Sequence, residues 1–454
     1  MKVNTAGRDF SKGSMLGNIM KLAGPMILAQ FVNVLYNVVD RIYIGRCGPE
    51  ASNALTGLGV CLPVLTMVIA FANLIGTGGS PLFSIERGRG NRAETERLLG
   101  NSFALLLIIG ALITITIYIV KRPVLMLLGA SEATISYADS YISVYSIGTI
   151  FVMLSLGLNS FINAQGFSKI GMMTVVIGAV VNIVLDPIFI FLFKMGVTGA
   201  ALATVISQGI SALWTFNFLT GKKTEVKIKL SAMKLEARRV KKILTLGVAG
   251  FVMGVTNSAV TMVANSVLKV FGGDTYIAVM TIVNSVREVI STPVNGITSS
   301  IQPVLGFNYG AGLMKRVKEG IRGATLVLII YTAVMWILVV VFAKEFLGMF
   351  TADAAIIEAG LKPLHVYFFG FVFMALQFSG QSVFVALGCA KRSIFFSIFR
   401  KVIIVIPLTI LLPNVMGVHG VFAAEPISNL VGGCASFFTM YFTLYKQLEK
   451  PKIQ

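Results

Sequence analysis

The sequence predicts an all-α polytopic membrane protein with 12 transmembrane helices in two six-helix lobes. The chain of 454 residues is 56% hydrophobic and only 13% charged, a balance typical of integral membrane proteins. Apolar runs long enough to cross a bilayer as helices, about 20 residues each, recur along the whole chain. Alternation of period two, which would predict a membrane barrel, is absent.

The first 15 residues are polar, and the helix after them is too long for the core of a signal peptide. It should therefore remain as the first span. Several apolar runs exceed the roughly 20 residues that a span needs, so their helices should tilt or kink. In chain order the expected spans are 16–44, 53–86, 98–120, 131–165, 170–193, 197–220, 240–270, 276–307, 319–343, 355–387, 393–413 and 417–445.

Basic residues gather between alternate spans. With the N-terminus placed in the cytoplasm, the cytoplasmic segments hold 29 of the 38 Lys and Arg residues, and Arg287 falls within a span. This asymmetry is the positive-inside rule and predicts that both termini are cytoplasmic. The length and the short loops suggest the inner membrane of a bacterial cell. Basic loops beside anionic lipid account for the net charge of +19 better than nucleic-acid binding does. The cytoplasmic segments are the N-terminus, 87–97, Lys169, 222–242, 315–322, 391–401 and 446–452.

An internal repeat divides the chain. An offset of 222 residues pairs Pro81 with Pro303, and it pairs Gly148 with Gly370. Each half contributes an even number of helices, so both enter the membrane in the same sense and are related by a pseudo-two-fold axis along the membrane normal. Duplicated membrane halves most often belong to transporters with a central site. The expected parts are an N-lobe at 1–220, a cytoplasmic linker at 221–241 and a C-lobe at 242–454.

The clearest candidate for chemistry is Asp186, inside the apolar run VVNIVLDPIFIFLF. An ionisable group in a span is costly, which makes it a functional candidate. Asn182 lies one turn earlier on the same helix face, and Pro187 disturbs the helix and frees carbonyl oxygens. These groups suit a hard cation such as Na⁺ or an acid that takes up a proton. The alternative is a polar network that only holds helices together.

The first span carries a polar stripe. Positions i, i+3, i+4 and i+7 share one face of a helix, and Pro25 upstream supplies a bend point. Alternatively, Asp40 lies at the external water interface and is simply solvated, since Gly45 and Gly48 follow soon afterwards. The stripe consists of Asn33, Tyr36, Asn37 and Asp40.

Three further charges fall within expected spans: Arg287 and Glu288 in the eighth and Glu425 in the twelfth. Adjacent helical residues do not face each other, so Arg287 and Glu288 need other partners. Structural pairing and substrate binding are equally open for these three. The two histidines are far apart and the four cysteines show no metal spacing, which disfavours an enzyme or a zinc site.

Five segments of the chain are distinctive: LAGPMILAQFVNVLYNVVDRIYIG, RGRGNRAETER, NSFINAQGFSK, and the pair NIVLDP and MGVTGAALATVIS. They resemble the MATE family, the multidrug and toxic compound extrusion transporters, and its MepA-like and DinF-like bacterial branch in particular. The resemblance covers roughly residues 16–445. It implies two six-helix lobes around a V-shaped cavity and a cation-coupled exporter without a cofactor other than H⁺ or Na⁺.

The resemblance also implies particular site residues. The cation site of similar proteins falls on Asp40, Asn182, Asp186 and Thr204. The polar pair of the family's fourth helix falls on Asn159 and Gln165, where Gln165 often corresponds to an acid; this departure weakens a proton-relay role for that helix. The repeat pairs Asp186 with Leu408, and only Thr204 gains a charge, since it corresponds to Glu425. Members of the family that couple through C-lobe acids on helices 7 and 10 are unlike this sequence, which has no acid in 243–270, so the coupling site should be in the N-lobe.

The expected function is therefore a cation-coupled antiporter, acting as a monomer, that exports amphipathic and cationic compounds by alternating access. The alternative is a flippase for lipid-linked precursors, which should line its cavity with several Arg or Lys; here only Arg287 lies deep in a span. A membrane enzyme or receptor is disfavoured. Polar residues should line a substrate cavity near the midplane. These are Asn33, Tyr36, Asn37, Asn159 and Asn163 in the N-lobe, with Gln377 and Gln381 opposite.

Overall fold

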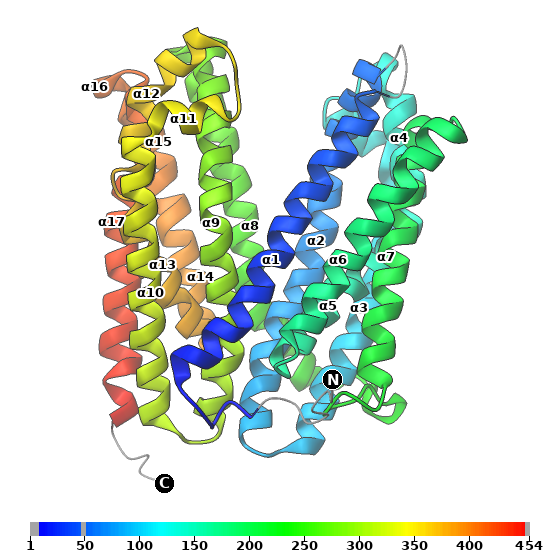
Figure 1. Ribbon diagram of the computed structural model, residues 1–454, viewed down its shortest axis with the longest axis vertical. Coiled ribbons are helices and arrows are strands. Elements are labelled where there is room, and N and C mark those ends of the chain that lie inside the picture. Colours follow the sequence, from blue (N-terminus) through cyan, green and yellow to red (C-terminus); the bar gives the residue numbers. More distant parts are fainter. Residues whose placement is uncertain (1–8, 47–50, 450–454) are drawn as a thin grey trace. The chain divides into compact units, whose positions relative to one another are not determined.

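The computed structural model describes residues 9–46 and 51–449, and every regular element among them is helical. Figure 1 shows their arrangement. In chain order the elements are α1 (Met15–Ile44), α2 (Ala51–Gly88), α3 (Arg92–Leu127), α4 (Glu132–Ile147), α5 (Thr149–Ala164), α6 (Ser168–Pro187), η1 (Ile188–Leu192), α7 (Gly196–Thr220), η2 (Leu230–Ala232), α8 (Ala237–Phe271), α9 (Gly273–Gly310), α10 (Met314–Val341), α11 (Ala343–Gly348), α12 (Ala354–Phe368), α13 (Phe371–Ala386), α14 (Ala390–Ile398), η3 (Phe399–Val405), α15 (Ile406–Leu411), α16 (Pro413–Met416), α17 (His419–Met440), η4 (Tyr441–Tyr445) and η5 (Gln447–Glu449).

Ten helices of the described residues are long and apolar enough to cross a membrane. Two bent pairs, α4 with α5 (55°) and α12 with α13 (45°), bring the number to 12 if each pair is one span. Large apolar side chains on the outer faces are exposed, as lipid-facing residues are: Ile119 is 74% exposed and Phe369 75%. The expectation of an all-α, multi-pass membrane protein is confirmed.

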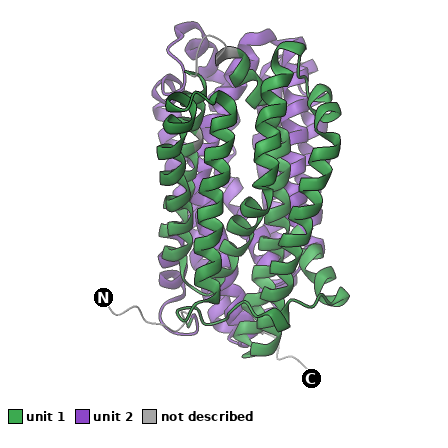
Figure 2. Ribbon diagram, turned by 90° about the vertical axis from the view of Figure 1, so that its right-hand side faces the viewer, with its two compact units in different colours: residues 1–9, 24–247 green, residues 10–23, 248–454 purple. Residues whose placement is uncertain are grey.

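The chain forms two compact units, coloured separately in Figure 2. Unit 1 comprises Met1–Asp9 and Gly24–Gly247, and unit 2 comprises Phe10–Ala23 and Val248–Gln454. This division differs from the lobes expected from the sequence in two places. Residues 10–23 belong to the second unit, and the expected linker belongs to the first. Helices α1 and α8 therefore each pass from one unit into the other.

Each unit repeats the same order of elements. A 38-residue helix comes second (α2 and α9), a bent pair comes fourth, and a π-helix lies within the fifth (η1 and η3). The bends fall at the paired glycines Gly148 and Gly370. A Cβ at Gly148 would lie 2.6 Å from the Val205 side chain, and one at Gly370 would lie 2.6 Å from the Pro426 carbonyl oxygen. The glycines thus let each bend pack against the last helix of its unit.

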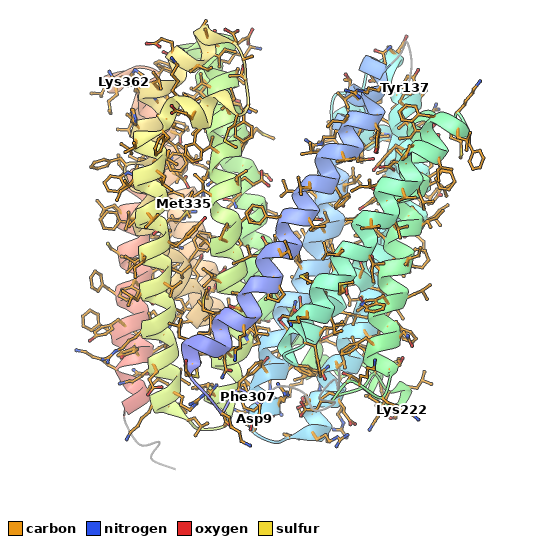
Figure 3. All side chains as sticks on the ribbon, viewed as in Figure 1. Asp9, Tyr137, Lys222, Phe307, Met335 and Lys362 are labelled. Carbon is orange, nitrogen blue, oxygen red and sulfur yellow. The ribbon has the colours of Figure 1, made fainter. Side chains whose placement is uncertain are left out.

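The two ends of the helices in each unit carry different residues. In unit 1 Tyr137 lies at one end and Lys222 at the other, and in unit 2 Lys362 and Phe307 lie at opposite ends (Figure 3). This placement is what a membrane-spanning bundle requires, because the basic segment that begins at Lys222 must lie outside the lipid.

Helices α2 and α8 meet at two glycines inside unit 1. A Cβ at Gly247 would lie 1.7 Å from the carbonyl oxygen of Leu74, and one at Gly78 would lie 2.2 Å from that of Ile243. Small residues at such a crossing let two helix backbones approach closely, which is a common way for helices to pack in membranes.

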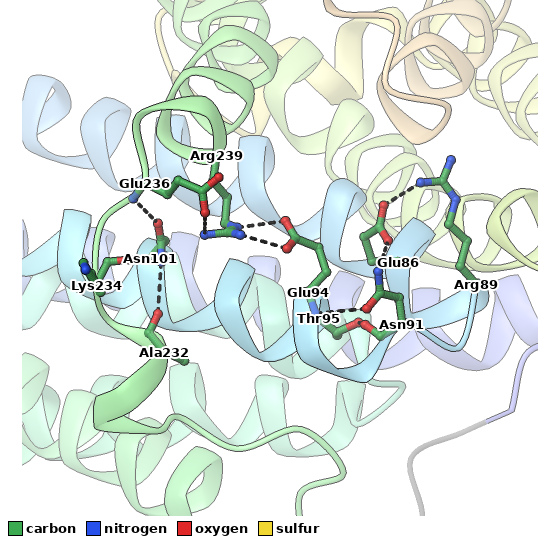
Figure 4. A network of polar contacts seen from close by, with 10 residues as sticks. All are labelled: Glu86, Arg89, Asn91, Glu94, Thr95, Asn101, Ala232, Lys234, Glu236 and Arg239. Carbon is green, nitrogen blue, oxygen red and sulfur yellow. Dashed lines mark hydrogen bonds and ion pairs between the residues drawn. The ribbon is translucent and has the colours of Figure 1, made fainter.

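Polar contacts fix the segment between α7 and α8, together with the first turn of α8, against α3. Arg239 makes a two-pronged ion pair with Glu94 of α3, with both N–O distances 2.8 Å. The Asn101 amide donates to the Ala232 and Lys234 carbonyls (both 3.0 Å) and accepts from the Glu236 backbone N–H (Figure 4). The positive residues of this segment are therefore partly used to fix it against α3.

Gln165 holds the same segment from the end of α5. It is fully buried, and its Oε1 accepts from the Thr224 hydroxyl (2.9 Å) and from the backbone N–H groups of Glu225 (3.1 Å) and Val226 (2.9 Å). Its Nε2 donates to the Val226 carbonyl. At the position where the family often has an acid, Gln165 thus has a structural role.

Gln165→Leu is expected to destabilise the protein by about 2–5 kcal/mol, because it leaves buried backbone N–H groups without acceptors at about 1–3 kcal/mol each. A thermal melt of the detergent-purified protein measures the change. Asn217→Leu, at an exposed position of α7, is the control and should change the melting temperature little. Equal melting temperatures for the two variants would contradict the role given to Gln165.

Candidate functional site

The site begins with two residues one helical turn apart on α6. Asn182 and Asp186 are 1% and 0% exposed, and the Asn182 Nδ2 donates to Asp186 Oδ1 at 3.3 Å. The same Nδ2 lies 3.5 Å from the Thr204 hydroxyl of α7. The helical spacing that predicted a shared face for Asn182 and Asp186 is thus observed, and the packing of α6 on α7 adds Thr204.

Asp40 of α1 meets this group. The carboxyl groups of Asp40 and Asp186 lie within hydrogen-bond reach of each other, although 146 positions separate them in the chain. Two carboxylates cannot bond directly without a proton, because each only accepts hydrogen bonds. The pair is therefore able to share a proton or to hold a cation.

Tyr141 of α4 completes the surroundings of Asp40. It is 2% exposed, lies close enough to Asp40 to interact with it electrostatically, and stacks on Tyr145 with ring centroids 6.0 Å apart. Tyr141 is not among the site residues predicted from the sequence. A signal was present, because Tyr137, Tyr141 and Tyr145 recur at the spacing of one helical turn.

Three oxygens of this site accept no hydrogen bond from the described residues, although each is buried: Asp40 Oδ1, Asn182 Oδ1 and Asp186 Oδ2. Buried acceptors without donors are costly, and carboxylate and amide oxygens are the ligands that hard cations prefer. The donor set therefore fits a proton or a small cation such as Na⁺. The site consists of Asp40, Tyr141, Asn182, Asp186 and Thr204.

A small polar cavity lies inside unit 1, between α1, α5, α6 and α7. Its volume of about 30 Å³ has room for one or two water molecules. Asn33, Tyr36 and Asn159, all predicted to line a cavity, contribute to its wall. Its other lining residues are Ser155, Leu156, Thr174, Val175, Gly178, Ala179, Ser207, Gln208 and Ser211.

Asn159 and Asn163 of α5 are held against α6 at Gly171. The Asn159 amide donates to the Gly171 carbonyl at 3.2 Å, and a Cβ at Gly171 would lie 2.6 Å from Asn159 Oδ1 and 2.5 Å from Asn163 Oδ1. Both Oδ1 atoms are buried and accept no hydrogen bond from the described residues. Gly171 therefore makes room for two amide groups that remain able to bind a polar partner.

The other residues predicted to line the cavity differ in whether their amide groups are hydrogen-bonded. Gln377 of α13 is 2% exposed, and both its Nε2 and Oε1 lack hydrogen-bond partners among the described residues. Gln381 donates to the Ser397 hydroxyl at 2.8 Å and is part of a bonded network. The side chain of Asn37 lies outside the described residues.

The two predicted bend points lie at different kinds of position. Pro187 is the last residue of α6 and is followed directly by the π-helix η1. Pro25 lies inside α1, which continues through it, and the boundary between the two units falls one residue earlier, at Gly24. A proline leaves the carbonyl one turn before it without its usual donor, which makes both positions suitable for bending.

The interpretation of the second unit's charges needs a correction. The sequence predicts that Arg287 is the one basic residue deep in a span and that Arg400 and Lys401 are cytoplasmic. Both lie in a candidate span, are 8% and 2% exposed, and pair with Glu425 together with Arg287. The signal was available, because both fall inside the expected span 393–413. Glu288 is exposed.

The family model described as MatE matches residues 25–188 and 250–411 of the chain. The Multidrug export protein MepA of Staphylococcus saprophyticus is 24% identical over 432 residues, which cover 95% of each protein. A solved outward-facing conformation of a multidrug resistance MATE family transporter of the MOP superfamily has a TM-score of 0.91 and 25% identity, covering 98% of this chain and 99% of that one. A MOP superfamily transporter from Pyrococcus furiosus, described by the reverse polarity of its binding pocket, has a TM-score of 0.90, 25% identity and the same coverage.

Proposed function

Because the chain belongs to the MatE family, we propose that it is an antiporter that exports amphipathic and cationic organic molecules in exchange for H⁺ or Na⁺. The observation that carries the proposal is the buried pair Asp40–Asp186, surrounded by oxygens without donors. The multidrug export proteins that cover nearly the whole chain support the choice of substrates.

The coupling step follows from the chemistry of the pair. Two neighbouring carboxylates repel each other, and uptake of one proton or one Na⁺ removes most of that repulsion. The ion then favours the arrangement of α1 and α6 that keeps the pair together. Transport results if the exported molecule favours the opposite arrangement, since each ligand shifts the same equilibrium. Pro25 and Pro187 are the bend points for this change.

We place the polar part of the substrate site beside the small cavity of unit 1. Asn33, Tyr36, Asn159 and Asn163 offer amide and hydroxyl groups there. The protein acts as a monomer in a bacterial plasma membrane, with both termini in the cytoplasm. The excess of Lys and Arg on that side supports this orientation, and it persists when Arg400 and Lys401 are moved into the membrane.

The test of the proposal is a transport assay. The purified protein is placed in liposomes and export of a fluorescent organic cation is followed under an imposed H⁺ or Na⁺ gradient. Export that follows one of the two gradients and stops when that gradient is dissipated supports antiport. Equal export with and without both gradients would overturn it.

The Thr204→Ala variant distinguishes H⁺ from Na⁺ as the coupling ion. Thr204 offers a neutral oxygen next to Asn182, and a neutral oxygen can bind Na⁺ but is not needed to hold a proton on a carboxylate. We therefore expect the variant to need more Na⁺ for half-maximal export if the ion is Na⁺, and to behave as wild type under a pH gradient if the ion is H⁺. Thr204→Ser restores the hydroxyl and is the control. A defect that Thr204→Ser shares equally would contradict this role.

A flippase for lipid-linked precursors is the second candidate. The structure of unit 2 favours a flippase more than the sequence does. Three basic residues, rather than one, lie near Glu425 in the spans of this unit. Such groups could hold a pyrophosphate. Movement of a fluorescent lipid phosphate between the leaflets of the same liposomes, without an ion gradient, would support this candidate over antiport.

A further inference from the structure

Unit 2 contains a buried cluster of charges on three elements. Glu425 of α17 has one oxygen, Oε1, that accepts from Arg287 of α9 (3.3 Å) and from Arg400 (3.1 Å) and Lys401 (2.9 Å) of η3. Lys401 also reaches Glu425 Oε2 at 3.2 Å. Three cations thus share a single carboxylate.

The cluster is unbalanced. One carboxylate faces two guanidinium groups and one lysine amine, so basic groups outnumber acidic ones among these four residues. Glu288 follows Arg287 but is exposed and points in a different direction on α9. Buried charges need counter-charges, because desolvation costs several kcal/mol per ion. The local chemistry therefore favours an additional anion.

The three cations are not equally enclosed. The side chains of Arg400 and Lys401 are 10% and 3% exposed, whereas that of Arg287 is 28% exposed and makes the longest of the three bonds to Oε1. Arg287 is therefore the cation that an incoming anion reaches first, and its pairing with Glu425 is the one most easily exchanged.

The surrounding backbone holds the cations in place. Arg400 donates to Asn429 Oδ1 at 2.6 Å, and its backbone carbonyl accepts from the Ser428 hydroxyl. A Cβ at Gly432 would lie 2.9 Å from the Arg400 side chain, so α17 is shaped to accept it. Arg400 and Lys401 also sit on a π-helix, an uncommon geometry that is frequent at functional sites.

We propose that Arg287, Arg400 and Lys401 form a binding site for the anionic group, a carboxylate or a phosphate, of an amphipathic molecule. Glu425 is the internal competitor: it neutralises part of the charge when the site is free and gives up Arg287 when the anion binds. If the bound molecule is also transported, the inference rests on the proposed function and extends the substrates to amphiphiles that carry a negative group. As a binding site it stands by itself.

The experiment compares two probes that share a naphthalene ring and carry polar groups of opposite charge. Purified full-length protein in an uncharged detergent is dialysed to equilibrium against naphthalene-2-carboxylate or against naphthalen-2-ylmethylammonium. Arg287→Gln should weaken binding of the carboxylate by about tenfold or more, the usual effect of losing a charged hydrogen bond, and should leave binding of the ammonium unchanged. Lys362→Gln removes an exposed cation from the same unit and is the control.

Glu425→Gln gives the opposite result and makes the test specific. It removes the competitor, so the carboxylate should bind more tightly than to wild type, whereas a structural ion-pair cluster would only lose stability. If this variant does not fold, Arg287→Lys decides in its place: it keeps the charge and should restore part of the affinity that Arg287→Gln loses. Equal carboxylate binding by wild type, Arg287→Gln and Arg287→Lys would overturn the proposal.

Two further arms identify the source of the anion. In nanodiscs, phosphatidylglycerol competes with the carboxylate if the natural ligand is a lipid headgroup, and phosphatidylcholine serves as the reference. Competition by inorganic phosphate but not by phosphatidylglycerol assigns the site to a soluble ligand. Carboxylate binding that depends on Arg287, found together with export independent of any ion gradient, would overturn the proposed antiport and leave this site standing.

Discussion

Asp186→Asn is expected to abolish ion-driven export. The amide keeps the size and some hydrogen bonds of the carboxyl group, but it neither takes up a proton nor offers a charge to Na⁺, so the ion gradient loses its connection to the protein. Asp40→Asn should act similarly, because the two carboxyl groups form one titrating pair. The measurement is export of a fluorescent organic cation from liposomes under an imposed gradient.

The controls separate loss of coupling from loss of folding. Asp353→Asn removes one charge outside the spans, where the side chain caps α12 and Asn caps equally well, so export should stay at the wild-type rate. Asp186→Asn should still insert into the membrane and still bind the organic cation. Full gradient-driven export by Asp186→Asn would place the coupling site elsewhere, with Glu288 and Glu425 as the next candidates.

Gly247→Leu is expected to prevent unit 1 from folding. Its Cβ would lie 1.7 Å from the Leu74 carbonyl oxygen, a backbone atom that cannot move aside like the end of a flexible side chain. Helices α2 and α8 would have to separate, and the packing at Gly78 would be lost with them. Size-exclusion chromatography of the fluorescently tagged protein should show aggregate in place of a single sharp peak.

Gly254→Leu on the same helix is the matched control. Nothing lies within 4 Å of a Cβ at Gly254, which is exposed, so the same substitution seven residues later should leave the peak and the melting temperature nearly unchanged. A sharp peak with a wild-type melting temperature for Gly247→Leu would show that the α2–α8 crossing is not required.

Local patterns in the sequence predicted the structural features that are set by residues close together in the chain. The spans followed from the length of the apolar runs, and the offset of 222 residues marked the glycines where α4–α5 and α12–α13 bend. The shared face of Asn182 and Asp186 followed from helical spacing. These features are set within one helix or by one repeat, so a single sequence contains enough information to find them.

Contacts between distant helices could not be predicted from local sequence patterns alone. The meeting of Asp40 with Asp186 was expected only from the family resemblance, because no local pattern relates two helices that far apart in the chain. Gln165 was expected to be a weakened relay residue, but its partners in the 224–226 segment give it a structural role. The placement of Arg400 and Lys401 in the cytoplasm was wrong, because assigning Lys and Arg to one side of the membrane assumes that basic residues near the end of a span lie in water. Here both side chains are buried and donate to Glu425 instead.

The passage of α1 between the two units has a consequence for biosynthesis. Residues 10–23 are synthesised well before the rest of unit 2, and the backbone carbonyl of Phe10 accepts hydrogen bonds from Asn308 and Arg316, about 300 residues later. At about 5–20 residues per second, roughly 15–60 s separate their synthesis. Residues 10–23 must therefore wait for these partners, so this part of unit 2 cannot form before Asn308 and Arg316 have been translated. Separate expression of 1–247 and 248–454 would leave the second fragment without this segment.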